Sequence, residues 1–172
     1  MSARSAADPL PGLVLLPFTD ALAPHFAAIN TAWIEEMFAM EPADRDVLDH
    51  PRARLIDTGG AILFVAAPDL GIIGAAALRK TGDAQFELTK MGVTTAARGR
   101  QAGAFLLAAI IARAYALGAE TVYLLTNRAC AAAIHLYEKQ GFVHDQQIME
   151  AFGARYARCD VAMRHRPDLR PD

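Results

Sequence analysis

The short segment from Val93 to Gly103, which reads VTTAARGRQAG, combines two arginines with the backbone amides of a predicted helix start. The segment lies between a strand-like stretch and a long apolar stretch of helical composition. The first amides of a helix have no partner within the helix and carry a partial positive charge, so they can bind a phosphate group. We therefore expect a phosphate or pyrophosphate site here, the alternative being a plain turn before a helix. The candidate ligands are Arg98, Gly99, Arg100, Gln101, Ala102, Gly103 and Ala104.

A second segment, AAAIHLYEKQGF (Ala131 to Phe142), places Tyr137 on a predicted helix. It follows a strand-like run, TVYLLT, and ends at a Gly-Phe pair that should stop the helix and begin another strand. Strand, Arg-Gly loop, long helix, strand and second helix therefore follow one another from Gln85 to Phe142.

This order of elements resembles the GNAT family of N-acetyltransferases. The family has two signatures, an Arg/Gln-x-x-Gly-x-Gly/Ala pyrophosphate loop and a later N-x-x-A-x-x-L-Y-E-K-x-G-F helix, and both have counterparts here in the same order. The wider pattern, from TAWIEEMF to YARCDVAM, resembles bacterial members that stand alone or follow a MarR-type winged-helix regulator. The resemblance implies an α+β fold with a central mixed, mostly antiparallel, splayed sheet flanked by helices.

Two positions depart from the family pattern. Gln101 replaces the first glycine of the loop motif, and we expect it to keep an ordinary helix-start conformation with its side chain turned away from the phosphate. Cys130 stands where the second motif has asparagine, and the nearest asparagine is Asn127. A longer turn after the strand would bring Asn127 to the same place.

The resemblance implies acetyl-CoA as the acetyl donor and no metal. Pantetheine would lie along the backbone of Met91, Gly92 and Val93 as an added strand, with Gly92 at a bulge or a close approach. The pyrophosphate would lie on the amides from Gly99 to Ala104, beside Arg98 and Arg100.

Glu87 is the candidate general base for an amine acceptor. It lies between Phe86 and Leu88 on the strand that leads into the loop, and basic glutamates occupy this strand position in histone-acetylating members of the family. Side chains alternate along a strand, which predicts that Glu87, Thr89, Met91 and Val93 share one face. The alternative is a solvated carboxylate, or one paired with Lys90 or Arg79.

The resemblance assigns Tyr137 as the general acid toward the CoA thiolate, from the first turns of its helix. The alternative is that Tyr137 packs in the core with Ile134 and Gly141, which lie at helical spacing.

In this fold the acceptor wall comes from the helices between the first two strands. The segment AWIEEMFAMEPAD places Trp33 and Met37 on one helix face with Glu36 alongside and Glu41 beyond. Trp33 would cover an apolar group, while Glu36 and Glu41 would recognise a cationic amine. The alternative is a packing aromatic side chain beside a solvated acidic face.

Composition limits the classes of protein to which the chain can belong. The 172 residues are 53% hydrophobic with a net charge of -2, enough for one domain with a large core and without the basic footprint of a nucleic-acid-binding protein. No apolar run long enough to span a membrane lacks a charge. The two cysteines, Cys130 and Cys159, lack metal-type spacing and suggest a reducing cytoplasm.

The pattern of turns and apolar runs predicts a lead-in that lacks ordered structure over 1–12, a single domain over 13–165 and a tail over 166–172. The resemblance implies that this domain is an acetyltransferase domain. Expected strands are Leu13–Pro17, Ala61–Ala67, Ile72–Lys80, Gln85–Val93, Thr121–Thr126 and Arg158–Met163. Expected helices are Asp20–Phe38, Asp44–Asp49, Ala102–Gly118 and one from Ala131.

The sequence thus predicts a cytoplasmic enzyme that moves an acetyl group from acetyl-CoA to a primary amine of a small molecule or peptide by direct attack. Two alternatives stay open, a non-catalytic acetyl-CoA sensor and a scaffold that uses only the fold. Nucleic-acid and membrane partners are not expected. The identity of the amine and the oligomeric state, with a homodimer among the choices, stay open.

Overall fold

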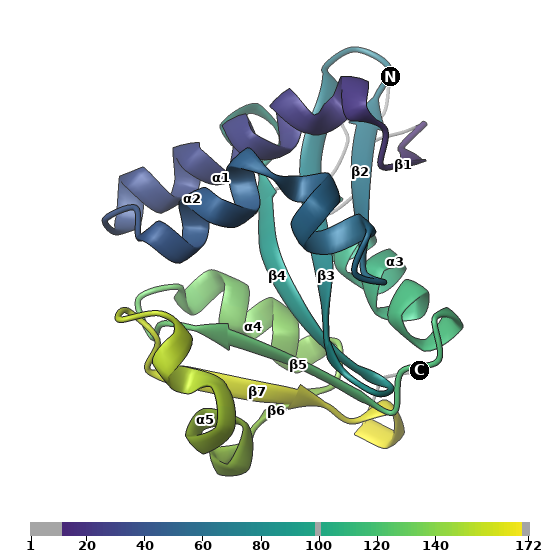
Figure 1. Cartoon of the computed structure of the whole chain (residues 1–172). Coiled ribbons are helices and arrows are strands. Elements are labelled where there is room, and N and C mark those ends of the chain that lie inside the picture. The colour runs from purple at the N-terminus through teal and green to yellow at the C-terminus, as the bar shows by residue number, and fades with distance from the viewer. Residues whose placement is uncertain (1–11, 99–100, 170–172) are drawn as a thin grey trace.

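One seven-stranded sheet forms the centre of the molecule, with strand order β1-β2-β3-β4-β5-β7-β6. The computed structural model describes residues 12–98 and 101–169. The strands are β1 (Val14–Pro17), β2 (Ala61–Ala67), β3 (Gly71–Gly82), β4 (Gln85–Val93), β5 (Thr121–Thr126), β6 (Phe142–His144) and β7 (Val161–His165) (Figure 1). The helices are α1 (Ala23–Met37), α2 (Pro42–Asp49), α3 (Ala102–Ala116), α4 (Ala131–Lys139) and α5 (Gln146–Phe152).

β4 and β5 are paired along only part of their length. They are the one parallel pair in the sheet, and they are in register from Gln85 opposite Thr121 to Leu88 opposite Leu124. Beyond Leu88 the two strands separate, while all other neighbours pair antiparallel. The expected mixed, mostly antiparallel and splayed sheet is confirmed.

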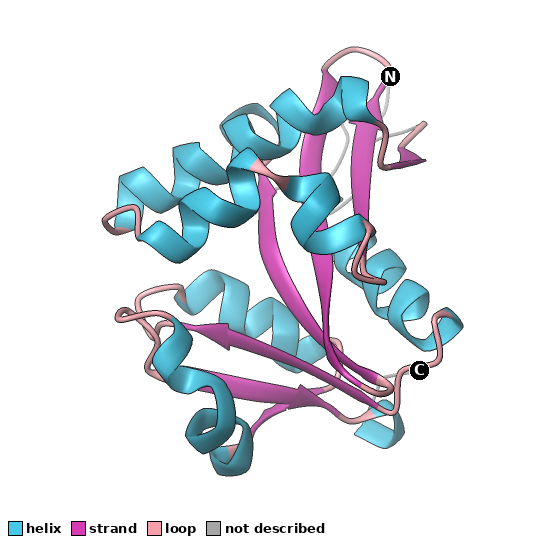
Figure 2. Cartoon of the chain, in the orientation of Figure 1, coloured by secondary structure: helices cyan, strands magenta, loops and turns pink. Residues whose placement is uncertain are grey.

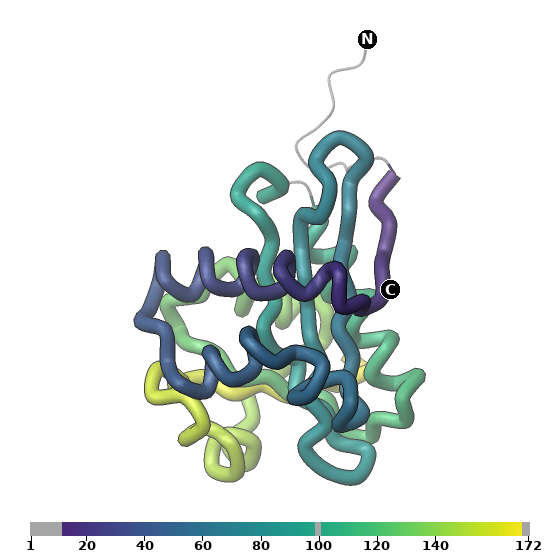
Figure 3. Tube along the Cα trace, turned by 45° about the horizontal axis from the view of Figure 1, so that its top comes forward, coloured from purple at the N-terminus to yellow at the C-terminus, as the bar shows by residue number. Residues whose placement is uncertain are grey.

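Helices cover both faces of this sheet (Figure 2). α3 is apolar along most of its length, and it buries Leu106, Leu107, Ile110 and Ile111 against one face, because these residues recur at the spacing of one helix side. α1 crosses the other face, in contact with β3 and β4, and α5 lies over β5 and β7 (Figure 3). The C-terminal end of α1 therefore approaches the place where β4 leaves β5.

A bulge in β4 changes which side chains share a face. The register with β3 shifts between Ala75 and Ala77, where β4 carries one extra residue, and Lys90 has a φ of 49°. As a result Met91 and Val93 pack on the α3 side, while Glu87 is buried on the other face. The expectation that Glu87, Met91 and Val93 share one face is therefore wrong, because strict alternation fails at a bulge.

Element bounds agree with the sequence in the centre of the sheet and differ near the C-terminus. β2, β4 and β5 have the predicted bounds, and Gly118 closes α3 with a φ of 94°. The last strand begins at Val161 rather than Arg158, because Arg158 is drawn to Asp44 and Cys159 donates back to Tyr156 in a turn.

An α-helix and a π-helical turn among the described elements were not predicted. α5 begins after Asp145, whose side chain accepts a hydrogen bond from the Ile148 amide at 3.0 Å. A π-helical turn, Arg52–Ile56, follows α2. Most of the expected lead-in, part of the tail, and the loop residues Gly99 and Arg100 lie outside the described residues.

Candidate active site

A cavity of about 560 Å³ opens where β4 and β5 separate. Residues 88–93 of β4 form one wall, and residues 124–127 of β5 and its following turn form the other. The rest of the lining comes from the end of α1, the starts of α3 and α4, and the segment before β7. These residues are Trp33, Glu36, Met37, Phe38, Ala97, Arg98, Gln101, Ala102, Gly103, Ala129, Cys130, Ala131, Ala132, Ala133, Leu136, Tyr137, Tyr156, Arg158 and Cys159.

The β4 wall contains the three residues expected beside pantetheine. Met91, Gly92 and Val93 all line the cavity. A Cβ on Gly92 would lie 2.6 Å from Cδ1 of Trp33, so only glycine lets the indole ring lie this close to the strand. Gly92 thus marks a close approach between α1 and β4.

Gln101, the residue directly before α3, has the backbone conformation expected of the glycine that it replaces. Gln101 adopts a left-handed conformation, with φ 61° and ψ 11°, immediately before Ala102. The expected helix-start conformation is therefore wrong, since Gln101 takes the backbone angles that a glycine adopts easily. Ala102 and Gly103 line the cavity, whereas Ala104 does not.

Gly103 presents its open side to the cavity. Among the described residues, a Cβ there would meet Leu136 at 3.5 Å and Val93 at 3.8 Å, and both of these residues line the cavity. Arg98 also lines it and contacts Glu36, with the guanidinium nitrogen 3.4 Å from the carboxylate. The α3 start, Arg98 and the β4 edge thus lie around one space.

Tyr137 lines the cavity and also packs against a neighbouring aromatic ring. Its ring meets the ring of Phe142 edge-on, with centroids 5.8 Å apart, and it also lines the cavity. It is the seventh residue of α4, in the second half of the helix rather than in its first turns. Burial, with a smaller contribution from Cys130, raises the pKa of Tyr137 above its ordinary value, so the phenol keeps its proton at neutral pH.

Asn127 lines the cavity but uses its side chain to shape the turn before α4. Its amide nitrogen donates to the carbonyl of Arg158 at 2.7 Å, and its side-chain oxygen accepts from the amide of Ala129 at 2.8 Å. Cys130, which stands at the motif's asparagine position, precedes α4 directly and lines the cavity as well.

Glu87 is not among the residues that line the cavity. Its side chain is buried and forms an ion pair with Arg155, which was not among the partners expected from the sequence. Burial raises the pKa of Glu87, although the charges of Arg155 and Lys90 act in the opposite direction. The geometry therefore gives no support to direct proton removal from an acceptor by Glu87.

Of the two acidic residues expected on the acceptor wall, one lines the cavity and the other does not. Trp33, Glu36 and Met37 line the cavity together, as their helical spacing predicts. Glu41 does not line it, because its carboxylate accepts from the Ala157 amide at 2.8 Å and from Arg158 at 3.2 Å. Glu41 thus stabilises the segment before β7 and is not free to recognise an amine.

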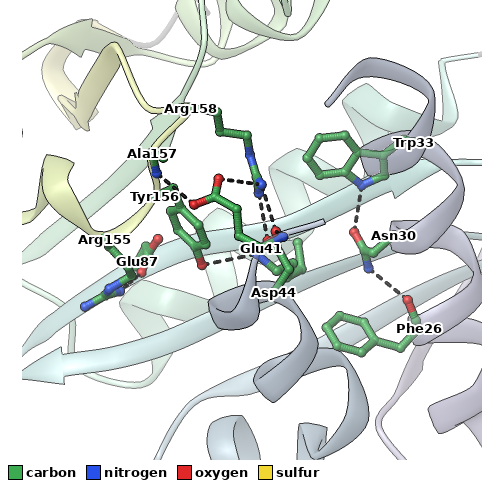
Figure 4. A network of polar contacts seen from close by, with 11 residues as sticks. Phe26, Asn30, Trp33, Glu41, Asp44, Glu87, Arg155, Tyr156, Ala157 and Arg158 are labelled. Atoms are coloured by element: carbon green, nitrogen blue, oxygen red, sulfur yellow. Dashed lines mark hydrogen bonds and ion pairs between the residues drawn. The ribbon is translucent and has the colours of Figure 1, made fainter. Parts of the chain in front are cut away.

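A buried ion cluster, not predicted as part of the site, joins α2, the β4 bulge and the segment before β7 (Figure 4). Lys90 lies 2.9 Å from Asp44 and donates to the Tyr156 hydroxyl at 3.1 Å. Arg158 donates twice to Asp44, each time at 2.7 Å, and once to Glu41. The signal in the sequence was Lys90, a lysine between Thr89 and Met91 within a predicted strand.

Asp44 is the centre of this cluster. Its side chain is fully buried, which by itself would raise its pKa. The hydrogen bond from Arg158 and the charge of Lys90 outweigh burial and hold the pKa of Asp44 well below its usual range. Asp44 is therefore ionised and binds the two cations that line the cavity.

The chain belongs to the GNAT acetyltransferase family: the family model "Acetyltransferase (GNAT) domain" matches residues 59–144. It is therefore an acyltransferase, and the matched region contains the β4 wall of the cavity, the start of α3 and Tyr137. None of the curated proteins matches the chain.

Solved structures share the fold. A GNAT-family acetyltransferase from Staphylococcus aureus Mu50 has a TM-score of 0.79 at 15% identity, over 91% of this chain and 99% of that one. PaiA N-acetyltransferase from Thermoplasma acidophilum, in complex with coenzyme A, has a TM-score of 0.69 at 14% identity, over 90% and 99%. A spermidine N-acetyltransferase SpeG chimera from Vibrio cholerae and hSSAT has a TM-score of 0.68 at 17% identity, over 91% and 96%.

The described residues contain neither a membrane-spanning helix nor a cluster of metal ligands. No helix within 12–98 and 101–169 combines the length and apolarity needed to cross a bilayer. Over the same ranges, no group of three or more His, Cys, Asp or Glu side chains is arranged to hold a metal ion.

Proposed function

We propose that the protein transfers the acetyl group of acetyl-CoA to the primary amine of a small molecule by direct attack. The observation that carries this proposal is the cavity itself, in which the start of α3, the free edge of β4 and Tyr137 line one space. An anion site, an unpaired strand edge and a proton donor are the three features that bind and activate a CoA thioester.

The donor binds along the β4 side of the cavity. Beyond Leu88, β4 no longer pairs with β5, so the backbone of Met91 to Val93 offers hydrogen bonds to the amides of pantetheine. The pyrophosphate lies at the first turn of α3, over Ala102 and Gly103, with Arg98 nearby.

Tyr137 then protonates the leaving group. As the amine nitrogen attacks the thioester carbonyl, the carbon–sulfur bond breaks and negative charge develops on sulfur. The Tyr137 hydroxyl gives its proton to that thiolate, since its raised pKa keeps it protonated beforehand. Tyr137 interacts with a charge that grows in the transition state, so it should affect turnover more than binding.

Glu36 is the proton acceptor in this proposal. It is the one carboxylate among the described residues that line the cavity, and it lies on α1 beside Trp33 and Met37. An amine arrives largely as an ammonium ion and must lose a proton before it attacks. Glu36 replaces Glu87 in this role because Glu87 is buried against Arg155, outside the lining.

The non-catalytic alternative is a sensor that binds acetyl-CoA without turnover. A sensor needs the cradle and the β4 edge but neither a lining phenol nor a lining carboxylate. The presence of Tyr137 and Glu36 in one cavity favours the enzyme. The spermidine acetyltransferase with the same fold supports a small-molecule amine as the acceptor.

The test is CoA-thiol release from acetyl-CoA over a panel of amino acids, polyamines, aminoglycosides and peptide N-termini, with the acetylated product identified by mass spectrometry. We expect at least one amine to yield product and CoA in equal amounts. Tight acetyl-CoA binding without acetylation of any amine would instead favour the sensor.

A further inference from the structure

Three residues with hydrogen-bond donors line the cavity, whereas the carboxylates that neutralise two of them do not. Lys90, Tyr156 and Arg158 line the cavity, whereas Asp44 and Glu41, which neutralise the two cations, do not. Coulombic interaction falls with distance and is weakly screened where water is excluded. A group in the cavity therefore meets the cations more closely than it meets the carboxylates.

The Tyr156 hydroxyl is oriented by this arrangement. Lys90 donates to the phenol oxygen at 3.1 Å, so the proton of Tyr156 itself must point in another direction. Within the described residues, no hydrogen bond from this hydroxyl to an acceptor is present. Tyr156 lines the cavity, so a ligand atom that reaches its hydroxyl would meet a hydrogen-bond donor.

The aromatic rings beside Lys90 and Arg158 are already in contact with these two cations, which disfavours a ligand cation there. The Lys90 ammonium lies 4.5 Å from the centre of the Tyr156 ring, and the Arg158 guanidinium lies 4.9 Å from it. Arg158 also lies over Phe38, at 5.6 Å. These ring faces are the usual sites for a ligand ammonium, and the protein's own cations already occupy them.

An apolar wall lies next to the donors. Trp33, Met37 and Phe38 follow one another at the end of α1, and all line the cavity. The indole nitrogen of Trp33 donates to Asn30 at 2.8 Å, so the ring turns only carbon surface to a ligand (Figure 4). This wall suits the hydrocarbon part of an acceptor.

From these contacts we propose that the acceptor is an amine that carries a carboxylate and an apolar side chain. The carboxylate accepts a hydrogen bond from Tyr156 and faces Lys90 and Arg158, the apolar part lies against Trp33 and Phe38, and the amine lies toward Glu36. This inference rests on the proposed function and adds the class of acceptor. It keeps Glu36 and not Glu41 as the residue that meets the amine, because Glu41 is bound to Arg158.

A binding experiment tests this class of acceptor without turnover. N-acetylphenylalanine and N-acetylphenethylamine differ only by the carboxylate, and each is titrated by calorimetry into protein saturated with CoA. We expect the carboxylate to improve affinity by roughly 10- to 100-fold, the usual size of a hydrogen bond to a charged group. Tyr156→Phe should remove most of that difference, whereas Tyr115→Phe, outside the cavity lining, should leave it intact.

Turnover separates this inference from the proposed function. Wild-type protein should acetylate phenylalanine with a kcat/KM at least about tenfold above that for phenethylamine or spermidine. Product formation with phenethylamine or spermidine at an equal or higher kcat/KM would overturn the inference and leave the proposed function standing. A carboxylate preference in binding without any acetylation would support the inference and count against the proposed function. A preference that survives Tyr156→Phe unchanged would also overturn the inference.

Discussion

In the proposed mechanism, departure of the CoA thiolate depends on the phenol of Tyr137. Tyr137→Phe removes the proton that the thiolate needs while it keeps the ring contact with Phe142. We expect kcat to fall by about 10²-fold or more, the lower end of general acid contributions, with the Kd for acetyl-CoA changed by less than about threefold. Steady-state kinetics with an amine acceptor and calorimetry with acetyl-CoA give the two numbers.

Tyr115→Phe is the matched control, because it removes a hydroxyl that contacts His165 outside the cavity lining. It should change stability rather than kcat. Wild-type kcat should also show no decline up to about pH 10 from loss of the Tyr137 proton, because burial raises its pKa. Equal kcat in Tyr137→Phe and wild type, with chemistry rate-limiting, would remove Tyr137 from the mechanism.

Glu36 and Glu87 are the two candidate general bases, and replacing each by glutamine distinguishes them. Glu36→Gln should lower kcat/KM by about 10²-fold, since the amide cannot accept the ammonium proton. Glu87→Gln should leave kcat/KM within about threefold, because Glu87 is buried with Arg155 outside the cavity lining. Thermal melts of both variants check folding. The opposite ranking would restore Glu87 as the base and remove Glu36.

Between elements, the ion cluster around Asp44 connects α2 to β4 and to the segment before β7. Asp44→Asn leaves Lys90 and Arg158 without their shared carboxylate, and breaking a buried pair costs about 3–5 kcal/mol. Because the folded-state pKa of Asp44 is depressed, this contribution is present above its unfolded pKa of about 3.9 and is lost as the pH falls toward the folded value.

Urea unfolding of wild type and Asp44→Asn between pH 7 and pH 3 measures this effect. The difference in the free energy of unfolding should be largest at neutral pH and should shrink below about pH 4. A difference that stays constant across this range would mean that the carboxylate charge contributes nothing to holding the elements together.

The loop between β4 and α3 contains a conformation that glutamine tolerates poorly. Gln101 has a φ of 61°, and the left-handed region costs a side-chain-bearing residue about 1–2 kcal/mol. Gln101→Gly should therefore raise the free energy of unfolding by roughly 1 kcal/mol. Gln147→Gly, at an exposed helical position of α5, should lower it by a similar amount. Destabilisation by both substitutions would contradict the assigned conformation of Gln101.

Across the whole molecule, local patterns were enough to place the centre of the sheet and the helix that begins at the cavity. Alternating and continuous apolar runs predicted the bounds of β2, β4 and β5, and the Arg-Gly loop before an apolar helix predicted the start of α3, where Ala102 and Gly103 line the cavity. Those features depend on residues close together in the sequence.

The acceptor side depends on contacts between distant segments, which local patterns do not contain. Lys90 meets Tyr156 across 66 positions, and Arg158 meets Asp44 across 114. The bulge at Lys90 also moves Glu87 away from the face assigned by alternation. The sequence therefore predicted residues of β4 and the start of α3 that line the cavity, whereas it did not predict the pairing of Glu87 with Arg155.

The central claim is that acetyl-CoA occupies the space between β4 and the starts of α3 and α4. Gly103 tests this claim, because a side chain there would point toward Leu136 and Val93 and take up cavity volume without striking the backbone. Gly103→Ala adds one methyl group within ordinary contact distance and serves as the folding control.

Calorimetric titration of acetyl-CoA into wild type, Gly103→Ala and Gly103→Val is the most direct measurement. We predict one site per chain in the wild type, a small loss of affinity for the alanine variant, and a loss of about tenfold or more for the valine variant, equivalent to about 1.4 kcal/mol. Equal affinities in wild type and Gly103→Val, or no binding by folded wild type, would contradict the account.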